Sequence, residues 1–283
     1  MTEYDLPDRV VADVVTLALA EDLGAAGDVT TLATVDAASV ARAALAARQD
    51  GVVAGLPVAE RVFAAVGQGR VVFEYGSADG ARVSAGEVLA TVSGPVRDLL
   101  TAERTALNLL GHLSGVATLT RRWVDAIAGT GAHVRDTRKT MPGLRALEKY
   151  AVRCGGGVNH RMSLSDAALV KDNHVAAAGG VVAAFRLVRA AHPDLALEIE
   201  VDTVEQARDV IAAGADLVLL DNMSPALMRE VVAFTRGRAK LEASGRLSLD
   251  NAREVAETGV DYLAVGALTH SAPVLDIGLD LGE

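Results

Sequence analysis

The sequence predicts an α/β protein in which a small sheet-and-helix module precedes an α/β barrel. Two patterns lead to this prediction. Short β-type runs broken by glycine occupy residues 40–94, whereas from about residue 133 short apolar strands alternate with amphipathic helices. Such alternation is typical of parallel βα units. About six units in some 140 residues suit a barrel, complete or incomplete, and a doubly wound parallel sheet is the alternative.

The elements of the first module can be assigned in order. Apolar spacing predicts a helix over 8–20, with Asp8 available as its cap after Pro7, and Gly24 to Thr31 is typical of a loop. A further helix is expected near 57–66, and a long helical stretch over 98–128 with a break near Gly111 or Gly115. The β runs are A-R-A-A-L-A-A-R (41–48), G-V-V-A-G (51–55), R-V-V-F-E-Y-G (70–76) and V-L-A-T-V-S-G (88–94).

The second region supplies the barrel elements. Its candidate strands are His133–Thr137, Ala168–Lys171, Ala196–Val201, Leu217–Leu220, Ala239–Ala243 and Tyr262–Val265. Its candidate helices span 177–191, 203–213, 224–236 and 248–258. We therefore expect an N-terminal domain over 1–112, on which the C-terminal tail could pack back, and a barrel domain over 113–283.

The composition indicates a soluble globular protein without nucleic-acid or membrane partners. Hydrophobic residues make up 51% of the 283 residues, which excludes a disordered or collagen-like chain. The net charge of −10 argues against a nucleic-acid binder, and no apolar run reaches the ~18 residues that span a bilayer. The acidic start lacks the features of a signal peptide, and the single Cys154 suits a reducing compartment. We expect a cytoplasmic location.

A basic segment interrupts this acidic chain. Residues 135–174 contain eight Lys or Arg and four Asp or Glu, and three of the four lysines of the chain (Lys139, Lys149 and Lys171) fall within it. The segment therefore carries +4, and the rest of the chain carries −14. Chance would explain one such lysine, but the cluster predicts a site for an anionic small molecule. His160 beside Arg161 is interpreted as an anion contact rather than a core histidine.

Polar groups also end nearly every predicted strand, where active sites of parallel folds lie. In L-E-I-E-V-D, alternation places Glu198, Glu200 and Asp202 on one strand face, which is either a water-facing edge or the barrel mouth. These carboxylates and Asp221 could hold Mg²⁺ or sugar hydroxyls. Two short pairs that follow the last strands favour phosphate binding by backbone N–H groups. They are Ser244-Gly245 and Gly266-Ala267.

Several motifs resemble the quinolinate phosphoribosyltransferase family, the carboxylating nicotinate-nucleotide pyrophosphorylases of de novo NAD synthesis. The most specific is R-D-T-R-K-T-M-P-G-L-R-A-L-E-K-Y-A-V-R-C-G-G-G-V-N-H-R (135–161), which continues through L-V-K-D-N-H (169–174). The others are A-E-R-T-A-L-N-L-L-G-H-L-S-G-V-A-T (102–118), E-I-E-V-D (198–202), L-L-D-N-M (219–223) and V-G-A-L-T-H-S (265–271). The resemblance implies an α+β open sandwich followed by an incomplete α/β barrel that carries the catalytic site.

The resemblance also implies roles for individual residues. The group that receives the two carboxylates of quinolinate would be Arg138, Lys139, His160, Arg161 and Lys171, joined by Arg104 of a neighbouring subunit in a homodimer or larger assembly. The group for phosphoribosyl pyrophosphate would be Glu200, Asp221, Ser244, Gly245, Gly266 and His270. Glu200 and Asp221 would serve Mg²⁺ indirectly, through pyrophosphate or water. Lys139 or Lys171 would assist the loss of CO₂.

One departure from the family pattern and two rival functions stay open at this point. The turn A-S-G-R-L places Arg246 where the family usually has a second glycine, and Arg246 either contacts phosphate or points outward. The first rival is a sister phosphoribosyltransferase that acts on another substrate, such as the paralogue associated with molybdate transport; nicotinate phosphoribosyltransferase is a cousin in fold, but its substrate has one carboxylate and would not need so dense a basic cluster. The second is a binding or regulatory subunit without catalysis, which need not keep both halves of a two-substrate site.

Overall fold

The computed structural model describes residues 6–282 and divides them into two compact units that are each discontinuous in sequence. The first contains the chain up to Arg121, residues Thr140–Gly156 and the chain from Ala267 onward. The second contains Arg122–Lys139 and Gly157–Gly266. The expected division at residue 112 falls inside helix α4 (Val96–Ala126), which both units share.

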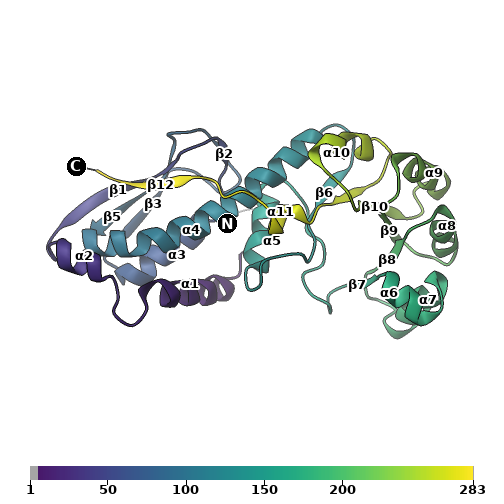
Figure 1. Ribbon diagram of the computed structural model, residues 1–283, viewed down its shortest axis with the longest axis horizontal. Coiled ribbons are helices and arrows are strands. Elements are labelled where there is room, and N and C mark those ends of the chain that lie inside the picture. Colours follow the sequence, from purple (N-terminus) through teal and green to yellow (C-terminus); the bar gives the residue numbers. More distant parts are fainter. Residues whose placement is uncertain (1–5, 283) are drawn as a thin grey trace. The chain divides into compact units, whose positions relative to one another are not determined.

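The first unit is built on a four-stranded antiparallel sheet with the order β12-β1-β5-β3 (Figure 1). Its strands are β1 (Val40–Ala47), β3 (Val72–Tyr75), β5 (Val88–Pro95) and β12 (Ile277–Leu281), and β2 (Gly51–Val52) pairs separately with β4 (Arg82–Val83). The C-terminal strand β12 pairs with β1 from Ile277 opposite Ala47 to Leu281 opposite Ala43. Residues Ile277–Leu281, close to the C-terminal end, are therefore part of the N-terminal sheet.

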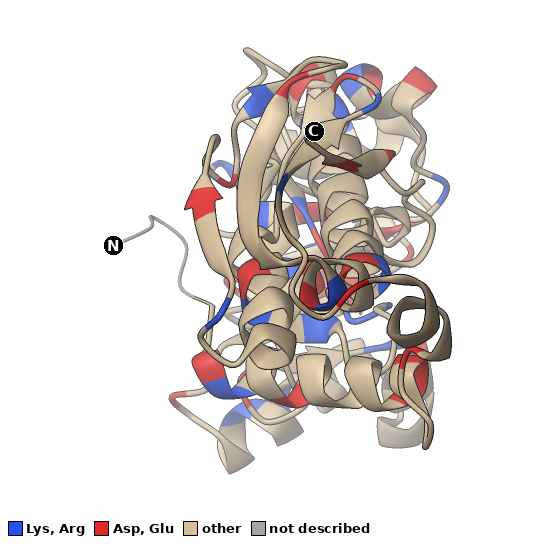
Figure 2. Cartoon of the chain, turned by 90° about the vertical axis from the view of Figure 1, so that its left-hand side faces the viewer, with Lys and Arg blue, Asp and Glu red and all other residues tan. Residues whose placement is uncertain are grey.

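Helix α3 (Leu56–Gly67) packs on β3 and β5, and α1 (Asp8–Leu23) packs on α3. The predicted helical spacing in α1 is confirmed, because Val11, Val15 and Leu19 recur every fourth residue and are buried. Figure 2 shows basic and acidic residues interspersed along the elements of the first unit. The remaining helices of the unit are α2 (Val29–Thr34), α5 (Arg145–Cys154) and α11 (Ala267–His270).

Two sequence predictions in this unit are wrong. The predicted loop runs into helix α2, which begins where the Asp28 carboxylate accepts the Thr31 N–H at 2.9 Å. A helix of six residues is too short for its apolar period to be recognised. The predicted break in α4 is also absent, since the helix runs from Val96 to Ala126. Its glycines serve close packing instead, because a Cβ on Gly115 would lie 2.1 Å from the carbonyl oxygen of Pro273.

This contact predicts that Gly115→Ala destabilises the protein, although alanine is the better helix former by about 1 kcal/mol. The added methyl group meets backbone, which cannot move aside as a side chain can, so we expect a loss of about 1–3 kcal/mol. Thermal unfolding measures it, with Asn108→Ala on the exposed face of the same helix as the control. A Gly115→Ala protein at least as stable as this control would contradict the packing explanation.

The second unit contains an open parallel sheet of six strands in the order β6-β11-β10-β9-β8-β7 (Figure 1). Its strands are β6 (His133–Arg135), β7 (Ala168–Val170), β8 (Leu197–Val201), β9 (Leu217–Asp221), β10 (Lys240–Ser244) and β11 (Tyr262–Ala264). Five strands follow in chain order, and β6 lies next to β11 instead of β7. This order, without the reversal of a doubly wound sheet, is that of an α/β barrel left open between β6 and β7.

The helices of the second unit flank this sheet, and α8 packs against both α7 and α9. They are α6 (Asp172–Ala178), α7 (Val181–Ala191), α8 (Val204–Ala212), α9 (Pro225–Thr235) and α10 (Leu249–Ala256). The single helix predicted over 177–191 is thus two helices, separated by Gly179 and Gly180 with φ of 80° and 140°. Within residues 6–282 no single helix has the length and apolar character to cross a membrane, and α6 with α7 meets that test only jointly, across a 90° bend.

Candidate active site

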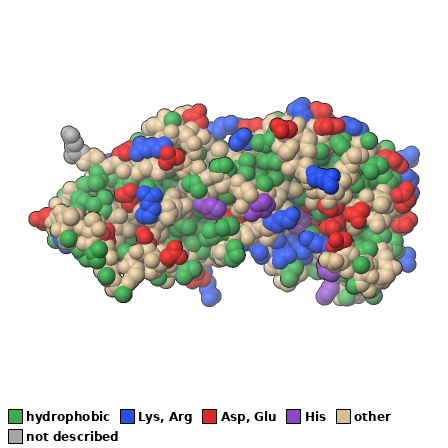
Figure 3. All heavy atoms as spheres, viewed as in Figure 1, with side chains coloured by type: hydrophobic (Ala, Val, Ile, Leu, Met, Phe, Trp, Pro, Cys, Tyr) green, Lys and Arg blue, Asp and Glu red, His purple; other side chains and the backbone are tan. Residues whose placement is uncertain are grey.

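A pocket of about 420 Å³ opens at the carboxyl ends of the parallel strands. It brings together eight of the predicted site residues, which come from segments far apart in the sequence. These are Arg138, Lys139, His160, Arg161, Lys171, Glu200, Asp221 and Ser244. Thr137, Asp172 and Glu242 also line it, together with Leu169, Leu219 and Ala264. Figure 3 shows basic and acidic side chains gathered beside each other on one face of the second unit, to which the pocket belongs.

Basic side chains from the segments after β6 and β7 form one wall of the pocket. Neither Arg138 nor Arg161 makes an ion pair within residues 6–282, and the Nε atom of Arg138 is buried without a hydrogen-bond partner. Burial lowers the pKa of Arg161, and the nearby charge of Arg138 lowers it further. Two neighbouring cations and an unused buried donor form a site that an anion would stabilise.

Lys171 is held at the start of α6, where its backbone N–H donates to Nδ1 of His174 at 2.9 Å. Its side chain faces the same pocket as Glu200, and its charge acts against the rise in the Glu200 pKa. Lys139 follows β6, and its backbone N–H donates to the hydroxyl of Thr137 at 3.0 Å. Both lysines are therefore carried by short turns whose backbones are hydrogen-bonded in place.

Glu200 and Asp221 form the acidic wall at the ends of β8 and β9. Burial raises the pKa of Glu200, and the neighbouring carboxylate of Asp221 raises it further. Asn222 has φ of 53°, donates from Nδ2 to Asp221 at 2.5 Å and from its backbone N–H to the Ser244 carbonyl at 2.9 Å. Neither carboxylate forms an ion pair within residues 6–282, and two adjacent carboxylates of this kind fit Mg²⁺, which prefers hard oxygen ligands and retains some of its water.

The turn after β10 brings backbone close to these residues. Gly245 has φ of 83°, and a Cβ there would lie 2.3 Å from Oδ1 of Asn222, so only glycine fits. Arg246 also has positive φ, 51°, and its carbonyl accepts a hydrogen bond from Asn251 at 3.0 Å. The Arg246 side chain is exposed and does not line the pocket. Of the two alternatives expected for Arg246, this is the outward orientation.

The structure does not place every predicted residue at the pocket. Gly245 and Gly266 follow β10 and β11 but are not among the lining residues. Arg104, exposed on α4, and His270, on α11, belong to the first unit, whereas all lining residues of the pocket belong to the second.

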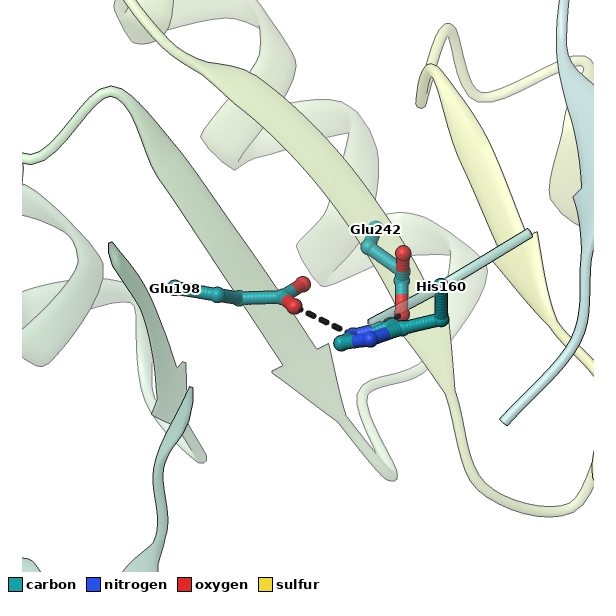
Figure 4. Close-up of side chains that lie close together, drawn as sticks. All are labelled: His160, Glu198 and Glu242. Carbon is teal, nitrogen blue, oxygen red and sulfur yellow. Dashed lines mark hydrogen bonds and ion pairs between the residues drawn. The ribbon is translucent and has the colours of Figure 1, made fainter. Parts of the chain in front are cut away.

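A buried cluster reaches the pocket through His160 and Glu242, and it joins the predicted His160 to two carboxylates that were not assigned to either substrate, Glu198 and Glu242. Figure 4 shows Glu198 of β8 and Glu242 of β10 pointing toward His160. Nε2 of His160 lies 2.6 Å from Glu198 and 3.8 Å from Glu242, and Arg135 donates to the other oxygen of Glu242 at 2.7 Å. Strand alternation had placed Glu198 on the same face as Glu200, so the missing information was its depth.

The carboxylates of this cluster are perturbed by their surroundings. Burial raises the pKa of Glu198 to about 7 and that of Glu242 to about 7, the latter also because Glu198 is close, while Arg135 opposes both shifts. His160, Glu198 and Glu242 have the donor atoms for a metal ion. However, Nε2 of His160 is already used in its hydrogen bond with Glu198, and the guanidinium of Arg135 already supplies a positive charge beside Glu242.

The raised pKa of Glu242 predicts a pH dependence of stability. An unfolded glutamate releases its proton near pH 4.5, whereas Glu242 keeps its proton in the folded protein up to about pH 7. This contribution to the free energy of unfolding is present below pH 4.5 and is lost as the pH rises to 7, by about 1–3 kcal/mol. Denaturant unfolding at pH 5 and pH 8 should show a smaller difference for Glu242→Gln than for the exposed control Glu205→Gln. Equal differences would contradict the assignment.

The fold and the pocket fit a class of protein, the α/β enzymes with anionic substrates, because basic and acidic side chains line one pocket at the carboxyl ends of the parallel strands. Comparison with known proteins gives the family. The models of the N-terminal and C-terminal domains of quinolinate phosphoribosyl transferase match residues 28–114 and 116–280. The chain belongs to the quinolinate phosphoribosyltransferase family.

Individual relatives support this membership over the whole chain. The nicotinate-nucleotide pyrophosphorylase [carboxylating] of Mycobacterium leprae is 55% identical over 277 residues, which cover 95% of this chain and 96% of that protein. The solved nicotinate-nucleotide pyrophosphorylase of Francisella tularensis matches with a TM-score of 0.95 at 36% identity, covering 99% and 98% of the two chains. NadC of Streptococcus pyogenes matches with a TM-score of 0.93 at 41% identity, covering 99% of each.

Proposed function

We propose that the pocket of the second unit is where quinolinate and phosphoribosyl pyrophosphate react. The chain is a quinolinate phosphoribosyltransferase (decarboxylating), which forms nicotinate mononucleotide, pyrophosphate and CO₂ in NAD biosynthesis. The observation that carries the assignment to this pocket is the pair Arg138 and Arg161, two neighbouring cations without an ion-pair partner in residues 6–282, which line the same pocket as the carboxylates Glu200 and Asp221.

The basic wall provides the complement to quinolinate, which has carboxylates on two adjacent ring carbons. An arginine can bind a carboxylate with two parallel hydrogen bonds, and the buried Nε of Arg138 is a donor available for one of them. Lys139 and Lys171 add compact positive charges. Without such cations, bringing two polyanionic substrates together in a pocket would cost several kcal/mol.

The acidic wall provides the complement to the ribose and to Mg²⁺-bound pyrophosphate. Glu200 and Asp221 would hold the ribose hydroxyls and the ion, directly or through water, with Ser244, Gly245, Gly266 and His270 on the phosphate side. The ion supplies charge neutralisation of the leaving pyrophosphate when it is bound. The two carboxylates also favour the positive charge that develops on the ribose ring as its bond to pyrophosphate breaks.

The chemistry then proceeds in two steps. The ring nitrogen of quinolinate donates its electron pair to the anomeric carbon, and the carbon–oxygen bond to pyrophosphate breaks. The ribosylated, positively charged ring next accepts the electrons of the bond to the carboxylate beside that nitrogen, CO₂ leaves, and the carbanion takes up one proton. Lys139 or Lys171 would stabilise the carbanion or supply this proton.

Turnover tests the proposed reaction. Loss of quinolinate absorbance should require phosphoribosyl pyrophosphate and Mg²⁺ and should release one CO₂ and one pyrophosphate per quinolinate. Nicotinate should not replace quinolinate, because it leaves part of the cationic wall without a partner. Equal turnover of nicotinate, or binding of both substrates without turnover, would favour one of the two rivals instead.

We also propose a homodimer or larger assembly in which Arg104 of one subunit completes the pocket of another. The support is that Arg104 is exposed on α4 and that the second unit forms its pocket from its own residues without it. A cytoplasmic location is part of the same proposal, and the buried, free Cys154 is consistent with a reducing compartment.

The shared site predicts complementation between two inactive variants. Arg104→Ala and Lys139→Ala should each be inactive alone, because each homo-oligomer lacks one basic group in every pocket. After mixing and subunit exchange, one pocket of each mixed dimer has both groups, so activity should return. Mass measurement with one variant tagged reports exchange, and no recovery despite demonstrated exchange would contradict a shared site.

A further inference from the structure

His160 is held by the protein at three points. Its backbone N–H donates to Oδ1 of the buried Asp136 at 2.8 Å. On the ring, Nδ1 lies 2.7 Å from the backbone nitrogen of Arg161, and Nε2 lies 2.6 Å from the carboxylate of Glu198 (Figure 4). The side chain of Glu198 is 98% buried, so water does not compete for this contact.

These contacts determine which ring nitrogen of His160 carries the proton. A backbone N–H is always a donor, so Nδ1 must present its lone pair to Arg161 and cannot be protonated. Nε2 then carries the proton and donates it to Glu198. Glu242 is too far for this role, because its nearest oxygen is 3.8 Å from Nε2 and its other oxygen accepts from Arg135.

The same contacts connect Glu198 to the basic wall. The backbone of Arg161 is fixed through Nδ1 of His160, and its NH1 donates to the carbonyl of Ala167 at 2.8 Å. The guanidinium therefore enters the pocket from a backbone whose position depends on the tautomer of His160. Without an acceptor beside Nε2, His160 is free to place its proton on Nδ1, and the contact with Arg161 becomes repulsive.

We propose that Glu198 is a positioning residue of the transferase, which acts through the tautomer of His160 to place Arg161 against the carboxylates of quinolinate. This inference rests on the proposed function of the pocket. In this inference His160 lines the pocket and also links the buried carboxylate of Glu198 to the backbone of Arg161.

The tautomer can be measured without any substrate. In the nitrogen NMR spectrum of the ¹⁵N-histidine-labelled protein, His160 should show an unprotonated Nδ1 and a protonated Nε2, and the His160→Asn variant assigns its signals. A protonated Nδ1, in either the neutral or the charged ring, would overturn the inference. This spectrum decides the matter even if substitutions at Glu198 prevent folding.

Steady-state kinetics measure the consequence for the substrate. Glu198→Leu should raise the KM for quinolinate about 10- to 100-fold, with little change in kcat or in the KM for phosphoribosyl pyrophosphate. Glu198→Gln should restore most of the affinity, since its amide oxygen still accepts from Nε2. The matched control is Ile199→Ala, buried on the opposite face of the same strand, which should lower the unfolding temperature without this selective change.

A double-mutant cycle tests whether Glu198 acts through His160. The quinolinate KM of the protein that carries both His160→Asn and Glu198→Leu should equal that of His160→Asn alone. Additive effects, or a KM change for Ile199→Ala equal to that for Glu198→Leu, would overturn this inference alone. A wild-type protein that does not turn over quinolinate would overturn the proposed function and this inference with it.

Discussion

Replacing Arg138 with alanine should weaken quinolinate binding by about 3 kcal/mol, or roughly 100-fold in Kd, and leave the fold intact. The reason is the buried Nε of Arg138, which has no hydrogen-bond partner in residues 6–282 and needs a ligand oxygen. Removal of the side chain takes away this donor and the charge beside Arg161. Because Arg138 makes no ion pair within residues 6–282, its removal should change the stability of the free protein little.

Calorimetric titration of quinolinate measures this loss, and thermal unfolding reports the fold. Arg186→Ala on α7 is the matched control, since it removes the same side chain from an exposed position outside the pocket. An Arg138→Ala protein that is folded and binds quinolinate as tightly as the control would exclude Arg138 from the binding site.

Replacing Glu200 with glutamine should lower kcat by about 100- to 1,000-fold while quinolinate still binds. The carboxylate of Glu200 lies in the acidic wall, and its raised pKa reflects burial and the proximity of Asp221, a charge pair that a bound cation would relieve. Glutamine keeps the shape and removes the charge. The transition state therefore loses stabilisation of the ribose and of the metal-bound leaving group, whereas the basic wall is unchanged.

Two measurements separate these effects. Initial rates over a range of Mg²⁺ concentrations should show a low kcat and a higher Mg²⁺ requirement for Glu200→Gln, and titration of quinolinate alone should show a nearly unchanged Kd. Glu205→Gln, exposed on α8, controls for the loss of one negative charge. A Glu200→Gln enzyme with normal kcat would contradict the role of the acidic wall.

The sequence predicted those features that depend on local pattern. The six barrel strands were each recognised from short apolar runs, and the polar residues that follow them, from Arg138 to Ser244, do meet in one pocket. Parallel strands bring their carboxyl ends to the same edge, so this part of the site required only the correct order of elements.

The features that the sequence did not predict depend on contacts between distant segments. The continuity of α4 could not be predicted because Gly115 packs against the backbone of Pro273, which is far away in the sequence. Helix α2 was missed for a local reason, since it begins at the Asp28 cap but is too short to show an apolar period. Glu198 was placed on the correct strand face, but only the tertiary contact with His160, beside Glu242 two strands away on β10, shows that it is buried. Depth in a sheet is set by tertiary packing, which alternation alone does not report.

Quinolinate is expected to bind in the pocket of the second unit, among the arginines and the carboxylates that line it. A crystal structure of the protein with quinolinate would show this binding site. Density for the ring should lie in this pocket, with one carboxylate within hydrogen-bond distance of Nε of Arg138 and the ring nitrogen directed toward Glu200 and Asp221. Quinolinate bound elsewhere on the chain, with Arg138 still lacking a partner, would contradict it.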